Sequence, residues 1–309
     1  MDNHDRAAMR ARTHAANTHL QRAARTLSSD ATLLDTGDSD VQEKLKALHP
    51  PLPSSSSLPP LPSNAPTVTV PSSSEMKRIL ESSDNGAAPG PSGWGGNMVS
   101  ILTNDDICVE GMSVLITNII NGDIPDEVRA HLISCRLVAL GKKDNGVRPI
   151  AVGELFYRVA AAHAACIVRD DAAELLAPHQ YGVGVNNGCT KIIHNISYSL
   201  TTVTNDTPLA CLSVDFSNAF NTIDRSKLLK DVYSNESLSP IYRLVHFAYN
   251  NPSPLLLSKS RGVHLESRNG VRQGDPLSSL LFSLGIKTYW ILYPDQLQLH
   301  SMHILMIYR

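Results

Sequence analysis

The chain has 309 residues, of which 42% are hydrophobic and 18% are charged, and its net charge at pH 7 is −2. This composition fits one large or two modest globular domains. It excludes a strongly basic protein that binds nucleic acid through its overall charge, although a local basic groove stays compatible with it.

The five cysteines stand far apart and form no CxxC pair, which argues against a zinc site and against a disulfide scaffold. The N-terminus lacks the apolar core of a signal peptide, and no apolar run is long enough to span a membrane. We therefore expect an intracellular protein, nuclear or cytoplasmic.

Residues 1–73 differ in composition from the rest of the chain. An Ala/Arg/His-rich stretch with a weak helical pattern is followed by a Pro/Ser-rich segment that runs from His49 to Ser74. Proline lacks an N–H donor and serine buries little apolar surface, so we expect residues 1–73 to be a disordered N-terminal region. The alternative is a polyproline ligand for an SH3-like partner.

The ordered part is predicted to begin near Ser72. Ser72 and Glu75 are spaced as a capping box ahead of a helix over 76–82. Further helices are expected over 104–121, 154–176, 189–203 and 238–249, and an apolar helix after Gly274. The predicted strands are 135–140 and 147–152, joined at an Asn-Gly turn, then 209–216 and a hairpin within 255–268. This mixture predicts an α+β fold.

The sharpest motif is SVDFSNAFNTID (213–224), in which Asp215 closes an apolar strand and precedes a turn into a helix. A carboxylate at the end of a buried strand, with the carbonyl of Phe216 beside it, offers the oxygen ligands that Mg²⁺ prefers. The alternative is an ordinary turn-forming or helix-capping aspartate.

The second motif, KKDNGVRP, places Lys142, Lys143 and Arg148 around a tight turn between two strands. Such a basic hairpin can hold a triphosphate, because arginine gives bidentate contacts and lysine gives a point charge. The alternative is a solvated hairpin whose lysines aid solubility.

The third motif is RQGDPLSSLLF, in which Gln273 and Gly274 precede an apolar helix. Glycine permits a close backbone approach, and glutamine can both donate and accept hydrogen bonds. The alternative, which is compatible with a functional role, is a helix entry with Asp275 as N-cap and Pro276 at the first helical position.

In this order, the three motifs resemble those of reverse transcriptases of the non-LTR retrotransposon type. GKKDNGVRPIAV (141–152) resembles the fingers hairpin, SVDFSNAFNTID resembles motif A, and GVRQGDPLSSLLFSL (270–284) resembles motif B. APGPSGWGGNM (88–98) and HQYGVGVNNGCTKIIHNI (179–196) are similar to further family segments. The resemblance covers about residues 74–287. It implies fingers over 74–205 and a partial palm over 206–309, built on a split βαβ-type sheet.

The resemblance also implies roles for individual residues. Motif A would supply a catalytic carboxylate, a carbonyl ligand and a steric gate against a 2′-hydroxyl, and the fingers and motif B would bind the nucleotide. The residues in these roles are Asp215 (catalytic and metal-binding), Phe216 (metal-binding carbonyl), Phe220 (gate), Lys142, Lys143 and Arg148 (triphosphate), and Gln273 and Gly274 (nucleotide and template pocket). The implied cofactor is Mg²⁺, and the implied partners are an RNA template, a DNA primer and deoxynucleotide triphosphates. In this mechanism, the primer 3′-hydroxyl attacks an α-phosphate in line.

The chain departs from the family pattern in two places. Asn221 stands where family members often carry Asp, and the aromatic-x-Asp-Asp motif C does not follow motif B. We therefore expect a chain truncated before motif C and inactive in polymerisation.

The tail SMHILMIYR suggests a cause, because one set of codons for it encodes Tyr-Leu-Asp-Asp when read two bases later. We hypothesise a frameshift near residue 288. Sequencing the locus tests this, and the absence of Tyr-x-Asp-Asp in every other frame would refute it.

Two alternatives to the polymerase interpretation stay open. The first is an RNA- or DNA-binding fragment without catalysis, which grips a strand through the basic hairpin. The second is a pseudogene product that does not fold stably, because a palm sheet without motif C would expose apolar surface.

Overall fold

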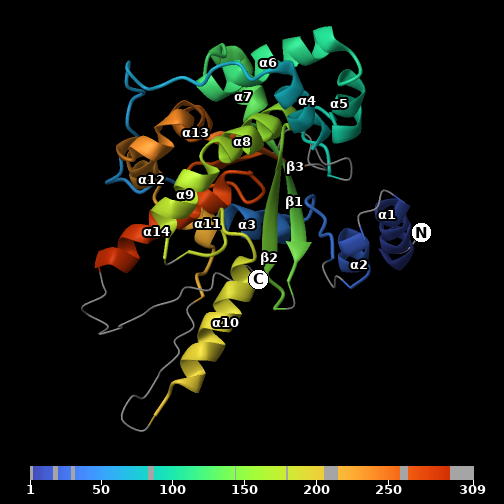
Figure 1. Cartoon of the computed structure of the whole chain (residues 1–309). Helices are drawn as coiled ribbons and strands as arrows, with labels where there is room; N and C mark the ends of the chain where they lie inside the picture. Colours follow the sequence, from blue (N-terminus) through green and yellow to red (C-terminus); the bar gives the residue numbers. More distant parts are fainter. Residues whose placement is uncertain are drawn as a thin grey trace.

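A four-stranded mixed sheet lies at the centre of the molecule, with helices packed around it (Figure 1). The computed structural model describes residues 3–16, 20–28, 32–82, 87–142, 144–178, 180–204, 215–257 and 264–292. The strand order is β2-β1-β3-β4; β1 runs antiparallel to β2 and parallel to β3, and β3 runs antiparallel to β4. The strands are β1 (Cys135–Gly141), β2 (Val147–Gly153), β3 (Ser253–Leu257) and β4 (His264–Ser267). One mixed sheet among many helices confirms the predicted α+β class.

The predicted hairpin is present as β1 and β2. The pairing ends at Gly141 opposite Val147, and the Lys142 N–H donates to the Gly146 carbonyl at 2.9 Å. Asn145 adopts a left-handed φ of 58°, a conformation that asparagine tolerates better than most residues. The β3–β4 hairpin is confirmed as well, although the residues of its turn, 258–263, lie outside the described residues.

The helices of the body share one apolar core. Ile116, Ala160, Leu229 and Leu281 are fully buried in the same cluster, so helices from the expected fingers and the expected palm pack together. The body consists of α4 (Ser73–Glu81), α5 (Gly96–Leu102), α6 (Asp106–Asn121), α7 (Asp126–Leu132), α8 (Leu155–Ile167), α9 (Arg169–Leu176), α10 (Gly188–Thr201), α11 (Ala219–Thr222), α12 (Arg225–Ser234), the 3₁₀ helix η1 (Glu236–Ile241), α13 (Tyr242–Tyr249) and α14 (Ser278–Leu292).

Among the described residues, no single helix is both long and apolar enough to cross a membrane. Helices α6 and α7 meet that test only when they are counted together across a bend of 96°.

Most predicted helices are present, with informative differences. Ser72 caps the helix as expected, because its side chain accepts the Glu75 N–H at 3.3 Å, which is one of the two bonds of a capping box. The single helix expected over 154–176 is instead two helices, α8 and α9, which meet at Val168 with φ −102° and ψ 13°. The helix expected over 238–249 begins as the 3₁₀ turn η1, which contains Pro240. The strand expected over 209–216 falls largely on residues 205–214, which lie outside the described residues.

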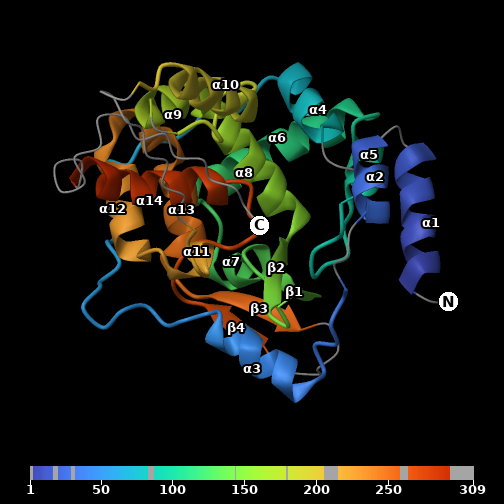
Figure 2. The same cartoon turned by 90° about the horizontal axis from the view of Figure 1, so that it is seen from below.

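The N-terminal region contributes more structure than its composition indicates. It forms α1 (Asn3–Ala16), α2 (Leu20–Ser28) and α3 (Ser39–Ala47). Leu33 pairs with Leu140 at the side of β1. Helix α3 buries Val41 and Leu45 against one face of the sheet, and α8 lies on the opposite side (Figure 2). Part of the stretch expected to be disordered therefore covers a sheet face.

The Pro/Ser-rich segment lies along the helices of the body. Arg243 donates to the Ala65 carbonyl at 2.9 Å, His246 donates to the Pro59 carbonyl at 3.1 Å, and the Asn121 side chain bonds both the N–H and the C=O of Val68. Prolines remove N–H donors but keep their carbonyls, so side chains of the body can still hold the segment.

One buried and one half-buried histidine predict a loss of stability in mild acid. Burial lowers the pKa values of His163 and His246 below the ordinary 6.5. The unfolded chain therefore takes up protons before the folded one, so the free energy of unfolding should be constant above about pH 6.5 and fall below it. Urea unfolding between pH 7.5 and 5.5, where carboxylates stay charged, measures this effect. The H163Q/H246Q variant should show a smaller pH dependence, and an unchanged dependence would contradict the assignment.

Candidate functional site

Two backbone hydrogen bonds join the three motifs. The Val271 N–H, in the motif B segment, donates to the Phe220 carbonyl of the motif A segment at 2.7 Å. Two residues later, the Gln273 carbonyl accepts the Ala151 N–H of β2 at 2.8 Å. The loop before α14 therefore lies between the motif A turn and the strand that carries Arg148.

Two glycines permit these close approaches. Gly270 has a φ of 64°, and a Cβ there would collide with the carbonyl of Phe220. Gly274 has a φ of 122°, and a Cβ there would lie 2.5 Å from the carbonyl oxygen of Ala151. Both positions combine a left-handed backbone with contact to another chain segment, which only glycine accommodates without strain.

An aromatic cluster holds the motif A segment against α14. The ring of Phe220 stacks on Phe282 with centroids 5.1 Å apart, and the ring of Phe216 meets the same side chain edge-on at 6.3 Å. Phe282 is buried and Phe220 is half-buried, whereas 43% of Phe216 is exposed. The residue expected to be the gate is therefore anchored by α14, the helix in which the motif B segment ends.

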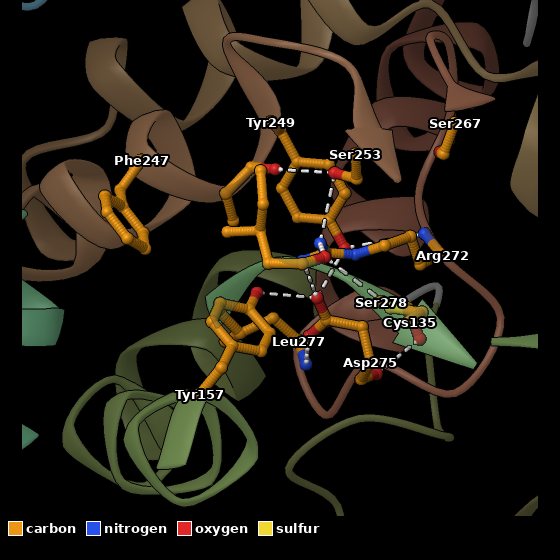
Figure 3. Close-up of polar contacts among 12 residues, drawn as sticks. Cys135, Tyr157, Phe247, Tyr249, Ser253, Ser267, Arg272, Asp275, Leu277 and Ser278 are labelled. Carbon is orange, nitrogen blue, oxygen red and sulfur yellow. Dashed lines mark hydrogen bonds and ion pairs between the residues drawn. The ribbon is translucent and has the colours of Figure 1, made fainter. Parts of the chain in front are cut away.

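A buried ion pair flanks Gln273 and Gly274 (Figure 3). The Arg272 guanidinium lies 2.8 Å from the Asp275 carboxylate, and each side chain is only 1% exposed. Arg272 also donates to the Ile133 carbonyl at 2.8 Å and to the Ser253 hydroxyl at 3.1 Å. The pair therefore holds together the loop that precedes α14.

Two tyrosines complete this network. The hydroxyls of Tyr157 and Tyr249 donate to Asp275 Oδ2 at 2.6 and 2.7 Å. The Arg272 guanidinium lies over both rings, 4.8 and 4.7 Å from their centroids. Burial, together with the charge of Asp275, raises the pKa of each tyrosine above its ordinary value. Both therefore keep the protons that they donate.

Asp275 also acts at the helix entry. Its Oδ1 accepts the Leu277 N–H at 2.9 Å, and its carbonyl accepts the Ser278 hydroxyl at 2.7 Å. These contacts agree with the helix-entry interpretation of the motif, and the hydroxyls of Tyr157 and Tyr249 add long-range partners to the same carboxylate.

The basic hairpin presents its cations away from this buried network. Lys142 is exposed, and Arg148 lies on β2 on the face opposite to Ala151, because side chains alternate along a strand. Neither side chain has a hydrogen bond or ion pair with another described residue. Lys143 lies outside the described residues. Gln273 is half-buried and Gly274 is exposed, so the corner beside β2 is open to solvent.

Asp215 is exposed at the start of the described motif A turn. Within the described part of the chain, no three His, Cys, Asp or Glu side chains gather closely enough to hold a metal ion. The Asp215 carboxylate and the Phe216 carbonyl alone do not match the donor set that a pair of Mg²⁺ ions needs. The described residues therefore do not fit a complete two-metal site.

The site predicted from the sequence did not include the buried polar residues of this region. Arg225, Arg272 and Asp275 are charged yet buried, and Tyr157 reaches Asp275 across 118 positions. The one available signal was the presence of charged residues beside apolar runs, which does not identify their partners.

Two comparisons with known proteins identify the family of the chain. Residues 140–304 match the family model described as "Reverse transcriptase (RNA-dependent DNA polymerase)". The chain is also 30% identical over 213 residues to the "Retrotransposable element SLACS 132 kDa protein" of Trypanosoma brucei gambiense. That alignment covers 68% of this chain and 17% of the relative, so the chain spans only a small part of the relative's length. The family match covers more than half of the 309 residues and includes the fingers hairpin from Lys142 together with motifs A and B, and the chain belongs to the reverse transcriptase family of retrotransposable elements.

Proposed function

We propose that this chain forms the fingers and partial palm of a mobile-element reverse transcriptase, and that these parts hold a template strand and an incoming deoxynucleotide. The observation that carries the proposal is the pair of hydrogen bonds from Val271 to Phe220 and from Ala151 to Gln273. These bonds unite three segments, far apart in the sequence, that would each contact the nucleotide.

In the proposed site, the hairpin binds the triphosphate and the corner of motif B receives the base. Lys142, Lys143 and Arg148 supply the cations, and arginine is suited to phosphate because its planar fork donates two parallel hydrogen bonds. Gln273 and Gly274 line the pocket beside β2. Lys142 and Gly274 are exposed, whereas Arg148 and Gln273 are half-buried. This partial exposure, and the bond from the Ala151 N–H that fixes the Gln273 carbonyl, support these roles.

The steric gate and the catalytic carboxylate come from the motif A segment. Phe220, stacked on Phe282, would exclude a 2′-hydroxyl, and Asp215 with the Phe216 carbonyl would supply part of a Mg²⁺ site. A single carboxylate does not hold two divalent ions against a triphosphate. We therefore propose that the 309-residue chain, tested alone, binds nucleic acid but does not extend a primer.

Primer extension on an RNA template tests this proposal. With Mg²⁺ and deoxynucleotides, the chain should bind the primer–template and leave the primer unextended. Binding should weaken steeply as salt rises, because phosphate contacts release counterions. The Asp215→Ala variant should bind equally well. Extension that disappears in Asp215→Ala would show that the chain holds a complete catalytic site.

The two alternatives give different results in the same assays. A binding fragment without any nucleotide site would bind RNA or DNA but would not bind deoxynucleotides. A chain that does not fold stably would melt over a broad range without cooperativity. The shared core of α6, α8, α12 and α14 favours a cooperative transition.

A further inference from the structure

An open groove lies between the end of α3 and strand β4. Its volume is about 450 Å³, and its lining includes Lys46 and His49 from one side and His264, Glu266 and Arg268 from the other. The lining also includes Pro51 and Leu265, so it combines apolar surface with charged side chains, and the groove is open to solvent. An open groove of this kind suits an extended ligand better than an enclosed small molecule. The groove takes no part in the site described above.

The lining carries a surplus of positive charge. Among the described residues of the groove, Glu266 is the only carboxylate, and Arg268 holds it at 2.6 Å. Lys46 is exposed and forms no ion pair with another described residue. His49 donates from Nδ1 to the Leu45 carbonyl at 2.7 Å, and burial lowers its pKa, so it is neutral at pH 7. Among the described lining residues, Glu266 therefore offsets the charge of Arg268, and Lys46 supplies the surplus positive charge.

The groove borders the motif A turn. Leu48, between Lys46 and His49, accepts a hydrogen bond from the Asn218 side chain at 2.8 Å. Asn218 follows Asp215 by three residues and has a left-handed φ of 53°. This hydrogen bond therefore joins the segment that carries Lys46 and His49 to the motif A turn.

We propose that this groove binds the phosphodiester backbone of a template or primer strand, with Lys46 and Arg268 as the phosphate contacts. The proposal rests on the proposed function, since it assigns a further contact to the same bound nucleic acid. Lysine and arginine side chains that neutralise phosphates supply much of the affinity of such interfaces and make it depend on salt.

Salt titrations of oligonucleotide binding by the 309-residue chain test the groove. For the K46Q/R268Q variant, affinity for single-stranded RNA should fall roughly tenfold, and the slope of log affinity against log salt should decrease by about 1.4. A DNA oligonucleotide of the same sequence shows whether the groove takes one strand type or both. The K44Q variant is the matched control, because Lys44 lies on the same helix, pairs with Asp40 at 2.7 Å and does not line the groove.

The outcomes separate the two proposals. If K46Q/R268Q binds both strands with the affinity and salt slope of the unaltered chain, the groove proposal is wrong and the proposed function stands. If the unaltered chain binds neither strand, the proposed function is wrong, and the groove proposal, which depends on it, is wrong as well. The charge-conserving K46R/R268K variant should retain binding, which distinguishes lost phosphate contacts from a disturbed fold.

Discussion

Replacing Arg272 by methionine is expected to lower the free energy of unfolding by about 3–5 kcal/mol, because it leaves the Asp275 carboxylate buried without its cation. The carboxylate is 1% exposed and cannot recover hydration without opening the core. The hydroxyls of Tyr157 and Tyr249 still donate to it, but neutral donors replace only part of the lost interaction.

A double-mutant cycle isolates the pair from its surroundings. Asp275→Asn keeps an oxygen for the tyrosine hydroxyls but leaves Arg272 without a negative partner. R272M/D275N removes both charges, so it should cost less than the sum of the single variants by about 1–3 kcal/mol. Urea unfolding of the four proteins gives this coupling energy.

An exposed pair of the same kind provides the control. Arg268 and Glu266 lie 2.6 Å apart, with side chains 58% and 34% exposed. Arg268→Met should cost less than about 1 kcal/mol, because water screens the pair. Equal costs for Arg268→Met and Arg272→Met would contradict the assignment of the buried pair as a major stabilising contact.

The buried pair also has a consequence at the candidate site. Arg272 and Asp275 bracket Gln273, whose carbonyl accepts the Ala151 N–H. Loss of the pair should loosen this corner. The rate of hydrogen exchange at the Ala151 amide should therefore increase more in Arg272→Met than the exchange rates of the α4 amides do. A uniform increase would indicate global destabilisation without a specific effect on the corner.

Local signals in the sequence predicted local structure well. The Asn145-Gly146 turn and the cap that Ser72 gives to the Glu75 N–H each depend on residues within a few positions, and both features are present. The order of three motifs identified the family, although the roles of Asp215 and Arg148 stay predictions.

Long-range partners could not be predicted in the same way. Tyr157 and Asp275 are 118 positions apart, and no periodicity in either segment pairs them. No proline or glycine lies near Val168 to indicate the break between α8 and α9 in the sequence. The prediction of disorder for the Pro/Ser-rich segment considered only the N–H donors that prolines lack. It did not consider the backbone carbonyls of the segment, which accept hydrogen bonds from Arg243 and His246.

Replacement of Arg225 is expected to have the second large effect on the free energy of unfolding. It is fully buried at the first position of α12, and its guanidinium donates to the carbonyls of Ser267, Asn269 and Gly270, with further bonds to the Asn251 carbonyl and the Ser267 hydroxyl. No carboxylate is among these partners. Burial lowers its pKa to about 9, so it stays charged at pH 7 with every donor in place.

Arg225→Met should therefore lower the free energy of unfolding by about 3–5 kcal/mol, since several buried carbonyls lose their donor together. Removing a buried charge returns some stability, but the bonds made by a charged donor outweigh that gain when so many acceptors depend on it. Lys230→Met, an exposed change on the same helix, should stay within about 0.5 kcal/mol of the unaltered chain.

Arg225→Lys tests whether the planar fork or the charge matters. Lysine keeps the charge but offers three donors from one atom, so it cannot span acceptors on Gly270, Ser267 and Asn269 at once. It should recover only part of the loss in Arg225→Met. Because Gly270 contacts Phe220, the lysine variant should also speed hydrogen exchange at the Val271 amide. Full recovery of stability by lysine would show that charge alone holds the loop that leads into motif B.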